Sequence, residues 1–348
     1  MALSSCTGIH DDATSPPKLA SVTYLVTPNG LGDNSYNDAA SEGIFGFSAE
    51  TGIPLSMLVP DGIDEAEVMM NEWLTANASR DSAVLIVGSS VYEDIARHMA
   101  DTRRDDLNTL RSHGGRVMMF ETDAAIDGIT TVIIARYGVS WLAGAMSRRF
   151  DALVLVATDG VALLEESIAG FMDAREDESL DADGGTCRTT LHYLSADASG
   201  FAMPDSAYRY IAARADNWFF YDEFIFPLLG GSEAGVVRFL NSDEFQMALM
   251  AGMDVDQTGL STRIPFSVVF KVGEVLNRLL HDWAEGTDWP AHLRLHLKDG
   301  AADIVITPNF IEYLSIIDDR YGDPDTFQLL YEQYKEQAIS KEESYENH

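Results

Sequence analysis

The chain has 348 residues, of which 46% are apolar, and 23 basic residues against 56 acidic ones give it a net charge of −33. That charge repels phosphate backbones, so we expect no nucleic-acid partner. The length suits two domains, each with its own core, and no apolar run is long enough to cross a bilayer. Two cysteines, Cys6 and Cys187, are too few for a disulfide framework.

Residues 1–19 read as a polar, proline-bearing tether. Cys6 ends the letters LSSC, a spelling that resembles a bacterial lipoprotein cleavage box, in which the cysteine becomes lipidated. The resemblance predicts a lipid anchor at Cys6 and a location in the cell envelope, outside the cytoplasmic membrane. Cys187 lies in a predicted surface loop and is expected to be a bystander.

From residue 20 onward, predicted strands and helices alternate in two blocks. In the first block we expect strands at 21–27, 54–59, 82–88, 116–122 and 130–135, and helices at 37–52, 65–77 and 92–115. In the second we expect strands at 151–158, 189–195, 217–222 and 247–254, and helices at 139–150, 160–174, 205–214, 232–240 and 267–286, then a hairpin at 293–306 and a final helix. This alternation predicts an α/β fold of two doubly wound lobes, with a ligand crevice at the carboxyl ends of the strands.

The predicted organisation follows from these two blocks. After the tether comes an N-terminal α/β lobe at 20–135, to which part of 260–338 is expected to return. A C-terminal α/β lobe spans 136–260, and a flexible, charged tail ends the chain at 339–348.

A glycine-bearing turn, GLGDNSYND at 30–38, follows the first strand. If it held the phosphates of a dinucleotide, Asp33 would place a like charge beside them, at about 4 kcal/mol per unit charge. A neutral ligand reverses that balance, because Asp33 and Asn37 can bond its hydroxyl groups while Tyr36 offers a flat face. The alternative is structural: Asp and Asn favour helix starts, and Tyr36 can be a core aromatic.

Four motifs follow one another in order over residues 20–310: DNSYN at Asp33–Asn37, WLAG at Trp141–Gly144, GMDVDQ at Gly252–Gln257 and SVVFK at Ser267–Lys271. The ordered set resembles that of the basic membrane protein family of lipoproteins. These are substrate-binding subunits of ABC importers and include bacterial purine-nucleoside receptors. GMDVDQ is the most specific of the four motifs.

The resemblance implies a fold of the type I periplasmic-binding-protein kind, whose two lobes close by a hinge over a nucleoside-like solute, and a partner ABC permease. It implies that Tyr36 and Phe201 stack on the base, Asp254 holds ribose hydroxyls and Lys271 adds a sugar contact. Gly230 belongs to a glycine-rich turn that lines the ligand in the family. The structural alternatives are a capping role for Asp254 and a surface role for Lys271.

Two further positions are ligand-binding candidates. Purine-nucleoside receptors of the family often read V-T-D after the first strand, whereas this chain has Pro28 and Asn29 in place of that Asp. Asn29 can still bond a base edge, so a different nucleoside or another small polar solute remains open. Ser89 follows a predicted strand and faces either the crevice or a helix start.

Nothing in the chain favours catalysis. The eight histidines show no metal-ligand spacing, and neither G-x-S-x-G, H-E-x-x-H nor a lysine-bearing phosphate loop occurs. We therefore expect a binding protein without enzyme activity, metal or cofactor. The alternatives are a ligand-sensing regulator on the same fold, a receptor that feeds a signalling partner, and a nucleoside- or dinucleotide-using enzyme.

Overall fold

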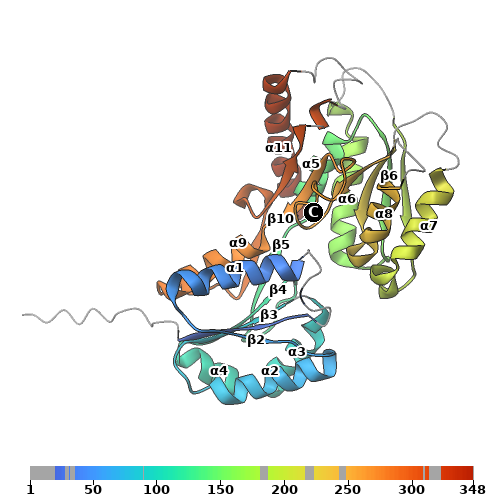
Figure 1. Cartoon of the computed structure of the whole chain (residues 1–348). Helices are drawn as coiled ribbons and strands as arrows, with labels where there is room; N and C mark the ends of the chain where they lie inside the picture. The colour runs from blue at the N-terminus through green and yellow to red at the C-terminus, as the bar shows by residue number, and fades with distance from the viewer. Residues whose placement is uncertain are drawn as a thin grey trace, which may run out of the picture.

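The computed structural model describes residues 20–27, 31, 36–88, 90–180, 187–215, 223–242, 248–308, 310–312 and 323–347, with only the backbone of Tyr36. Within these residues, two six-stranded sheets form two lobes (Figure 1). The predicted α/β fold with two doubly wound lobes is confirmed.

The first lobe is built on a wholly parallel sheet in the order β11-β5-β4-β3-β1-β2. Its strands are β1 (Ser21–Leu25), β2 (Leu55–Leu58), β3 (Ala83–Val87), β4 (Arg116–Phe120), β5 (Thr130–Ile134) and β11 (His292–Leu295). Its helices are α1 (Tyr36–Thr51), α2 (Ile63–Asn77), η1 (Ser90–Tyr92), α3 (Glu93–Thr102), α4 (Arg104–Ser112) and α9 (Val272–Ala284).

The second lobe has the sheet order β12-β10-β9-β8-β6-β7, in which only β12 runs antiparallel to its neighbour. Its strands are β6 (Asp151–Val156), β7 (Thr189–Tyr193), β8 (Glu223–Leu228), β9 (Leu249–Gly252), β10 (Phe266–Phe270) and β12 (Ala302–Ile306). Its helices are α5 (Tyr137–Met146), α6 (Ala162–Glu176), η2 (Glu178–Leu180), η3 (Ala198–Ala202), α7 (Pro204–Ala215), η4 (Gly230–Ser232), α8 (Glu233–Leu240), η5 (Leu297–Asp299) and α11 (Pro324–Glu346).

Each sheet is apolar on both faces because helices cover both. In β1, Val22 and Tyr24 contribute to one core and Leu25 to another, as expected of side chains that alternate along a strand. Helices α1 and α9 cover one face of the first sheet, and α2, α3 and α4 cover the other (Figure 1). In the second lobe α5, α6 and α11 lie opposite α7 and α8. One hydrophobic cluster runs from α1 and α9 through to α5, α6 and α11, so the inner cores of the two lobes are continuous.

The chain crosses between the sheets three times: from β5 to α5, from β10 to α9, and from β11 to β12. Backbone hydrogen bonds hold the crossings side by side. The N–H of Ala135 donates to the carbonyl of Leu295 at 2.7 Å, and the N–H of Lys271 donates to that of Ala301 at 2.8 Å. These three segments form the connection between the two lobes.

Helix α11 packs against α5 and continues to Glu346, so the flexible tail expected at 339–348 is wrong as far as that residue. Ala338 and Glu342 are buried in this contact, at 0% and 1% exposure. The Glu342 carboxylate accepts the backbone N–H groups of Gly138 and Leu297, each at 3.0 Å. One acidic side chain thereby joins the first and third crossings.

Three predicted elements differ from the structure. The helix expected at 92–115 is two helices, because Arg103 leaves the helical backbone region at φ −119° and ψ 28°. The helix expected at 267–286 begins only at Val272, since the β-branched and aromatic residues of 266–270 form the buried strand β10. The hairpin expected at 293–306 does not exist: β11 and β12 belong to different sheets. The strand expected at 217–222 and the tether at 1–19 lie outside the described residues.

Gly43 of α1 and Gly273 of α9 lie in direct backbone contact. A Cβ on Gly43 would lie 2.0 Å from the carbonyl oxygen of Gly273. We expect Gly43→Ala to lower the free energy of unfolding by about 2–3 kcal/mol, because the two helices must separate. Chemical denaturation measures this loss.

Gly46, one helical turn further along α1, is the matched control. A Cβ there would have its nearest neighbour, the Asn277 amide nitrogen, at 3.4 Å. Gly46→Ala should therefore be neutral or stabilising by up to about 1 kcal/mol, through helix propensity. Equal effects of the two substitutions would contradict the close contact.

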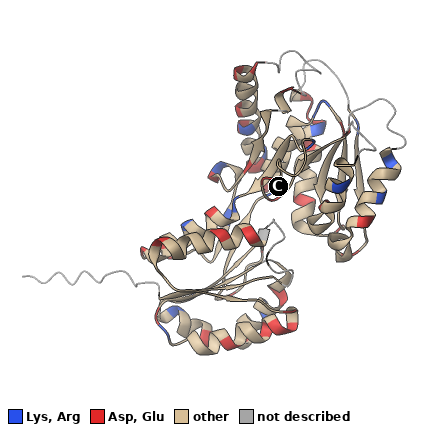
Figure 2. Ribbon diagram, in the orientation of Figure 1, with Lys and Arg blue, Asp and Glu red and all other residues tan. Residues whose placement is uncertain are grey.

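Acidic residues outnumber basic ones along the helices of the first lobe (Figure 2). Neither α1 nor α2 contains a Lys or Arg, while Asp38, Glu42, Asp64 and Glu65 lie in their first two turns. The first two turns of both helices are therefore negatively charged. Among the described residues, no helix combines the length and the apolar character that crossing a membrane requires.

Candidate functional site

Polar side chains from both lobes converge on one arginine. Arg136 follows β5, Glu121 follows β4 and Asp254 follows β9, so all three lie at carboxyl ends of strands. The Arg136 guanidinium pairs with Glu121 at 3.2 Å (Nη2 to Oε1) and with Asp254 at 3.6 Å (Nη1 to Oδ1). The first pair lies within the first lobe, and the second reaches into the second lobe. Arg136 therefore links the carboxyl edges of the two sheets, which is where doubly wound folds generally bind ligands.

Both acidic partners adopt a backbone conformation that side chains rarely take. Glu121 has φ 62° and Asp254 has φ 68°. Non-glycine residues in this left-handed region carry a backbone cost of order 1–3 kcal/mol, and such residues concentrate at functional sites. The surrounding structure imposes this cost at the two positions that aim carboxylates at Arg136.

Arg136 is enclosed by further contacts. Its side chain is 8% exposed, and the guanidinium carbon lies 4.2 Å from the ring centre of Phe270 at the end of β10. The Glu166 carboxylate of α6 accepts the backbone N–H groups of Arg136 and Tyr137, at 2.8 and 3.1 Å, where α5 begins. The arginine is therefore held from both its backbone and its side chain.

Glu233, the first residue of α8, is a second acidic feature beside Asp254. It is 6% exposed, and its Oε2 accepts from Nε2 of Gln257 at 3.4 Å. Burial raises the pKa of Glu233 well above its ordinary value, and the negative charge of Asp254 raises it further. Two acids with different environments thus lie side by side at this edge.

Phe201 and Gly230, two of the predicted ligand residues, are brought together. Phe201 lies in η3 and is half-buried, while Gly230 opens η4 with φ 52°. A Cβ on Gly230 would lie 3.1 Å from Cδ1 of Phe201, so glycine permits both the turn and the approach of the ring. This contact is in the second lobe, at the carboxyl end of β8.

Asp254 and Lys271 flank the same crossing. The Phe270 N–H donates to the Asp254 carbonyl at 3.0 Å, and Lys271 follows Phe270 as the residue before α9. The Lys271 side chain is half-buried, and its ammonium forms no hydrogen bond or ion pair with another described residue.

Asn37 makes a buried structural contact. It is 5% exposed, and its amide donates to the Thr27 hydroxyl at 2.7 Å, which ties the start of α1 to the end of β1. Asn29, Asp33, Ser89 and Cys6 lie outside the described residues, as does the Tyr36 side chain. The WLAG motif is buried in α5, where Gly144 allows close packing on Phe171 of α6.

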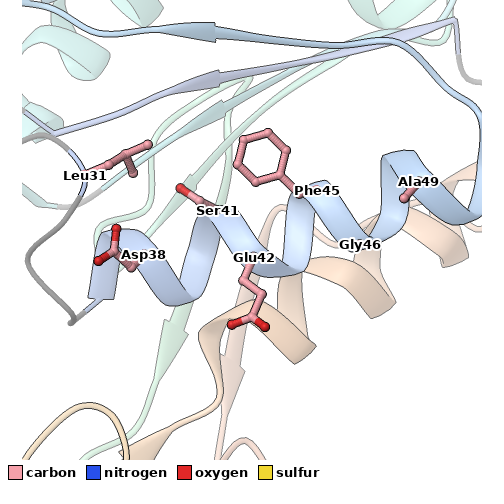
Figure 3. Close-up of a pocket in the computed structure, with 7 residues that line it drawn as sticks. All are labelled: Leu31, Asp38, Ser41, Glu42, Phe45, Gly46 and Ala49. Carbon is pink, nitrogen blue, oxygen red and sulfur yellow. The ribbon is translucent and has the colours of Figure 1, made fainter.

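A shallow pocket of about 550 Å³ lies along one side of α1 (Figure 3). It is lined by Leu31, Asp38, Ser41, Glu42, Phe45, Gly46 and Ala49. None of the predicted ligand residues whose side chains the structure describes lines it. The polar convergence at Arg136 is therefore a separate feature from this surface pocket.

Arg136, Glu121 and Glu233 were not among the predicted site residues. A usable signal existed for the first two, because both follow buried apolar strands directly and strand ends face the ligand in doubly wound folds. Glu233 carried no such signal, since an acid in the first turn of a helix is common for electrostatic reasons alone.

The comparisons with known proteins concern the fold. No family model matches the chain, and no curated protein sequence matches it. The fold is similar to that of an ABC transporter solute-binding protein from Aeropyrum pernix K1, with a TM-score of 0.67, 16% identity, and 92% of each chain covered. A transcriptional activator of the comK gene from Bacillus halodurans gives a TM-score of 0.61 at 14% identity, covering 87% of this chain and 96% of that one.

A third similar structure was solved with a ligand. It is an ABC transporter solute-binding protein from Burkholderia graminis C4D1M in complex with D-arabinose, with a TM-score of 0.56, 12% identity, and 83% of this chain and 96% of that one covered. The chain therefore has the two-lobed α/β fold found in ABC transporter solute-binding proteins.

The groups at this site can recognise a polar ligand. Carboxylates and a guanidinium can bond hydroxyl groups, and an aromatic ring can cover a flat ligand face. No group of His, Cys, Asp and Glu in the described part of the chain has an arrangement that could hold a metal ion.

Proposed function

We propose that this protein is the solute-binding component of an ABC importer, and that it captures a neutral, hydroxyl-bearing solute of the nucleoside type between its lobes without chemical change. The observation that carries the proposal is the convergence of Glu121 and Asp254, one from each lobe, on Arg136. A ligand at this point touches both lobes, so its binding energy can favour the closed state.

The charges at the site favour a neutral ligand. The cations Arg136 and Lys271 accompany the carboxylates of Glu121 and Asp254, so neither sign dominates. An ionised carboxylate that accepts hydroxyl hydrogen bonds contributes about 1.5–3 kcal/mol for each bond. Phe201 beside Gly230 supplies an aromatic face, the feature that a base requires and a small sugar can also use.

Titration calorimetry with inosine, adenosine, cytidine, uridine, D-arabinose and D-glucose tests the proposal. We expect heat with at least one nucleoside and a roughly 10- to 100-fold loss of affinity in Asp254→Asn, as the loss of a charge-assisted bond implies. Asp256→Asn is the matched control, because Asp256 lies in the same turn, is exposed, and bonds only Thr258 among the described residues.

Three outcomes would redirect the proposal. Binding of sugars alone would replace the nucleoside by a monosaccharide, and no heat with any of the six would remove the ligand class. Release of free base from inosine over time would favour a nucleosidase.

The proposed lipid anchor is tested separately, by fatty-acid labelling of the full chain and of Cys6→Ser.

A ligand-sensing regulator is the second candidate, because one similar structure is described as a transcriptional activator. In a gel-shift assay we expect no DNA binding, given the net charge of −33. A sequence-specific shift would favour the regulator.

A further inference from the structure

Glu233 is a buried carboxyl group behind the turn that carries Asp254. It is 6% exposed, and its Oε1 has no hydrogen-bond partner among the described residues. Native structures rarely leave a buried polar atom without a partner, so the position requires an explanation. Burying an ionised carboxylate with one oxygen that accepts no hydrogen bond costs much free energy, whereas burying the protonated carboxyl group costs much less.

The turn in front of Glu233 is tightly built. Oε1 of Gln257 accepts the N–H of Met253 at 3.4 Å, and the N–H of Gln257 donates to Oγ of Ser267 at 2.9 Å. Nε2 of Gln257 reaches back to Glu233, also at 3.4 Å. Asp254 lies inside this turn in its left-handed conformation. Glu233 thus supports the turn from behind, through Gln257.

The charged groups around Glu233 are few. The turn after β9 contributes Asp254 and also Asp256, which is exposed and bonded to Thr258. Neither η3, η4 nor β10 contributes a titratable side chain. Helix α7, which packs against α8, carries the titratable residues Asp205, Tyr208, Arg209, Tyr210 and Arg214. Asp205 pairs with Arg238 of α8 at 2.8 Å, and Arg214 pairs with Glu223 at 2.6 Å. No cation among the described residues pairs with Glu233, and its acidic neighbour Asp254 opposes its ionisation.

We propose that Glu233 is a positioning residue for Asp254: its protonated carboxyl group supports the turn at residues 253–257, and loss of that proton loosens the turn and weakens solute binding. The predicted change in solute affinity rests on the proposed function. The predicted change in the turn does not depend on any ligand. The raised pKa of Glu233 has the direction that this role requires. Deprotonation strengthens the bond from Gln257, but it also places a buried negative charge next to that of Asp254, and opening the turn to water relieves this larger cost.

The first experiment needs no ligand. Hydrogen exchange of the amides of residues 253–257 is followed in the intact protein and in Glu233→Gln, at matched values from about pH 5 to about pH 9, a window that covers the raised values known for buried glutamates. The amide of glutamine imitates the protonated acid but cannot ionise. As pH rises, we expect the exchange protection of these amides to fall in the native protein relative to Glu233→Gln. At the acid end of the window the two proteins should show equal protection.

The second experiment measures affinity for the nucleoside that binds best, over the same pH window. We expect the native protein to lose about tenfold in affinity toward alkaline pH while Glu233→Gln stays nearly constant. Glu233→Ala should bind weakly throughout, because it lacks the contact to Gln257. Glu274→Gln is the control: this glutamate also lies in the first turn of a helix but is exposed, and its variant should follow the native profile.

Identical exchange and affinity profiles for the native protein and Glu233→Gln would overturn the inference, as would normal affinity in Glu233→Ala. Failure of all six solutes to bind would count against the proposed function, and the exchange experiment would still decide the role of Glu233.

Discussion

Glu342→Ala is expected to lower the free energy of unfolding by about 3 kcal/mol, a large effect for a residue so close to the end of the chain. The carboxylate is 1% exposed and accepts the N–H groups of Gly138 and Leu297. Alanine leaves both buried donors without an acceptor at two of the three crossings. Glu342→Gln keeps one acceptor oxygen but turns an NH₂ group toward the other donor, so we expect an intermediate loss.

Glu343 is the matched control for this measurement. It is the next residue of α11 and pairs with Lys298 at 2.8 Å, but both side chains are about half exposed. Exposed ion pairs contribute little, so Glu343→Ala should change the free energy of unfolding by less than about 1 kcal/mol. Denaturant unfolding of the three variants beside the native protein gives these values. A Glu342→Ala protein as stable as Glu343→Ala would contradict the proposed joining of the crossings.

Arg136→Met is expected to lower the free energy of unfolding by about 2–3 kcal/mol and to abolish measurable solute binding. Methionine fills much of the volume over Phe270 but leaves Glu121 and Asp254 without their cation. Removing one partner of a buried ion pair costs about 3–5 kcal/mol, and we expect less here because both acids are 20% exposed. Denaturant unfolding and titration calorimetry measure the two effects.

Two further variants separate charge from geometry at this position. Arg136→Lys retains the positive charge but not a planar group that reaches two carboxylates, so we expect intermediate stability and weak binding. Arg97→Met removes an exposed arginine that pairs with Glu93 along α3, and it should cost less than about 1 kcal/mol. Native-like solute binding by Arg136→Met would remove Arg136 from the site.

Much of the fold was predictable because its signals are local. The apolar runs at 82–88 and 151–158 and the amphipathic run at 65–77 match β3, β6 and α2 within two residues at each end. Two of the wrong predictions concern segments whose structure depends on pairing with distant strands. The run at 266–270 continues without a break into the amphipathic α9, and only pairing with β9 and β12 makes it a strand. Similarly, β11 and β12 resemble a hairpin until each is paired with its own sheet.

The candidate site was predictable only in part. Asp254 and Lys271 came from the ordered motifs, and Phe201 and Gly230 came from the wider family resemblance. The structure places all four at or beside the carboxyl edge of the second sheet. Their role in ligand binding stays a prediction. Arg136 gave no motif, because its importance lies in two partners that are 15 and 118 positions away along the chain.

The amino-acid sequence by itself determined the alternation of strands and helices, the two-lobed architecture and the acidic surface, since periodicity and charge are properties of neighbouring residues. Only the tertiary structure decided that Glu121 and Asp254 meet at Arg136, that Glu233 lies behind Asp254, and that Glu342 joins two crossings. These arrangements depend on contacts between distant segments, which form only when the sheets assemble and bury their faces, and no local pattern encodes them.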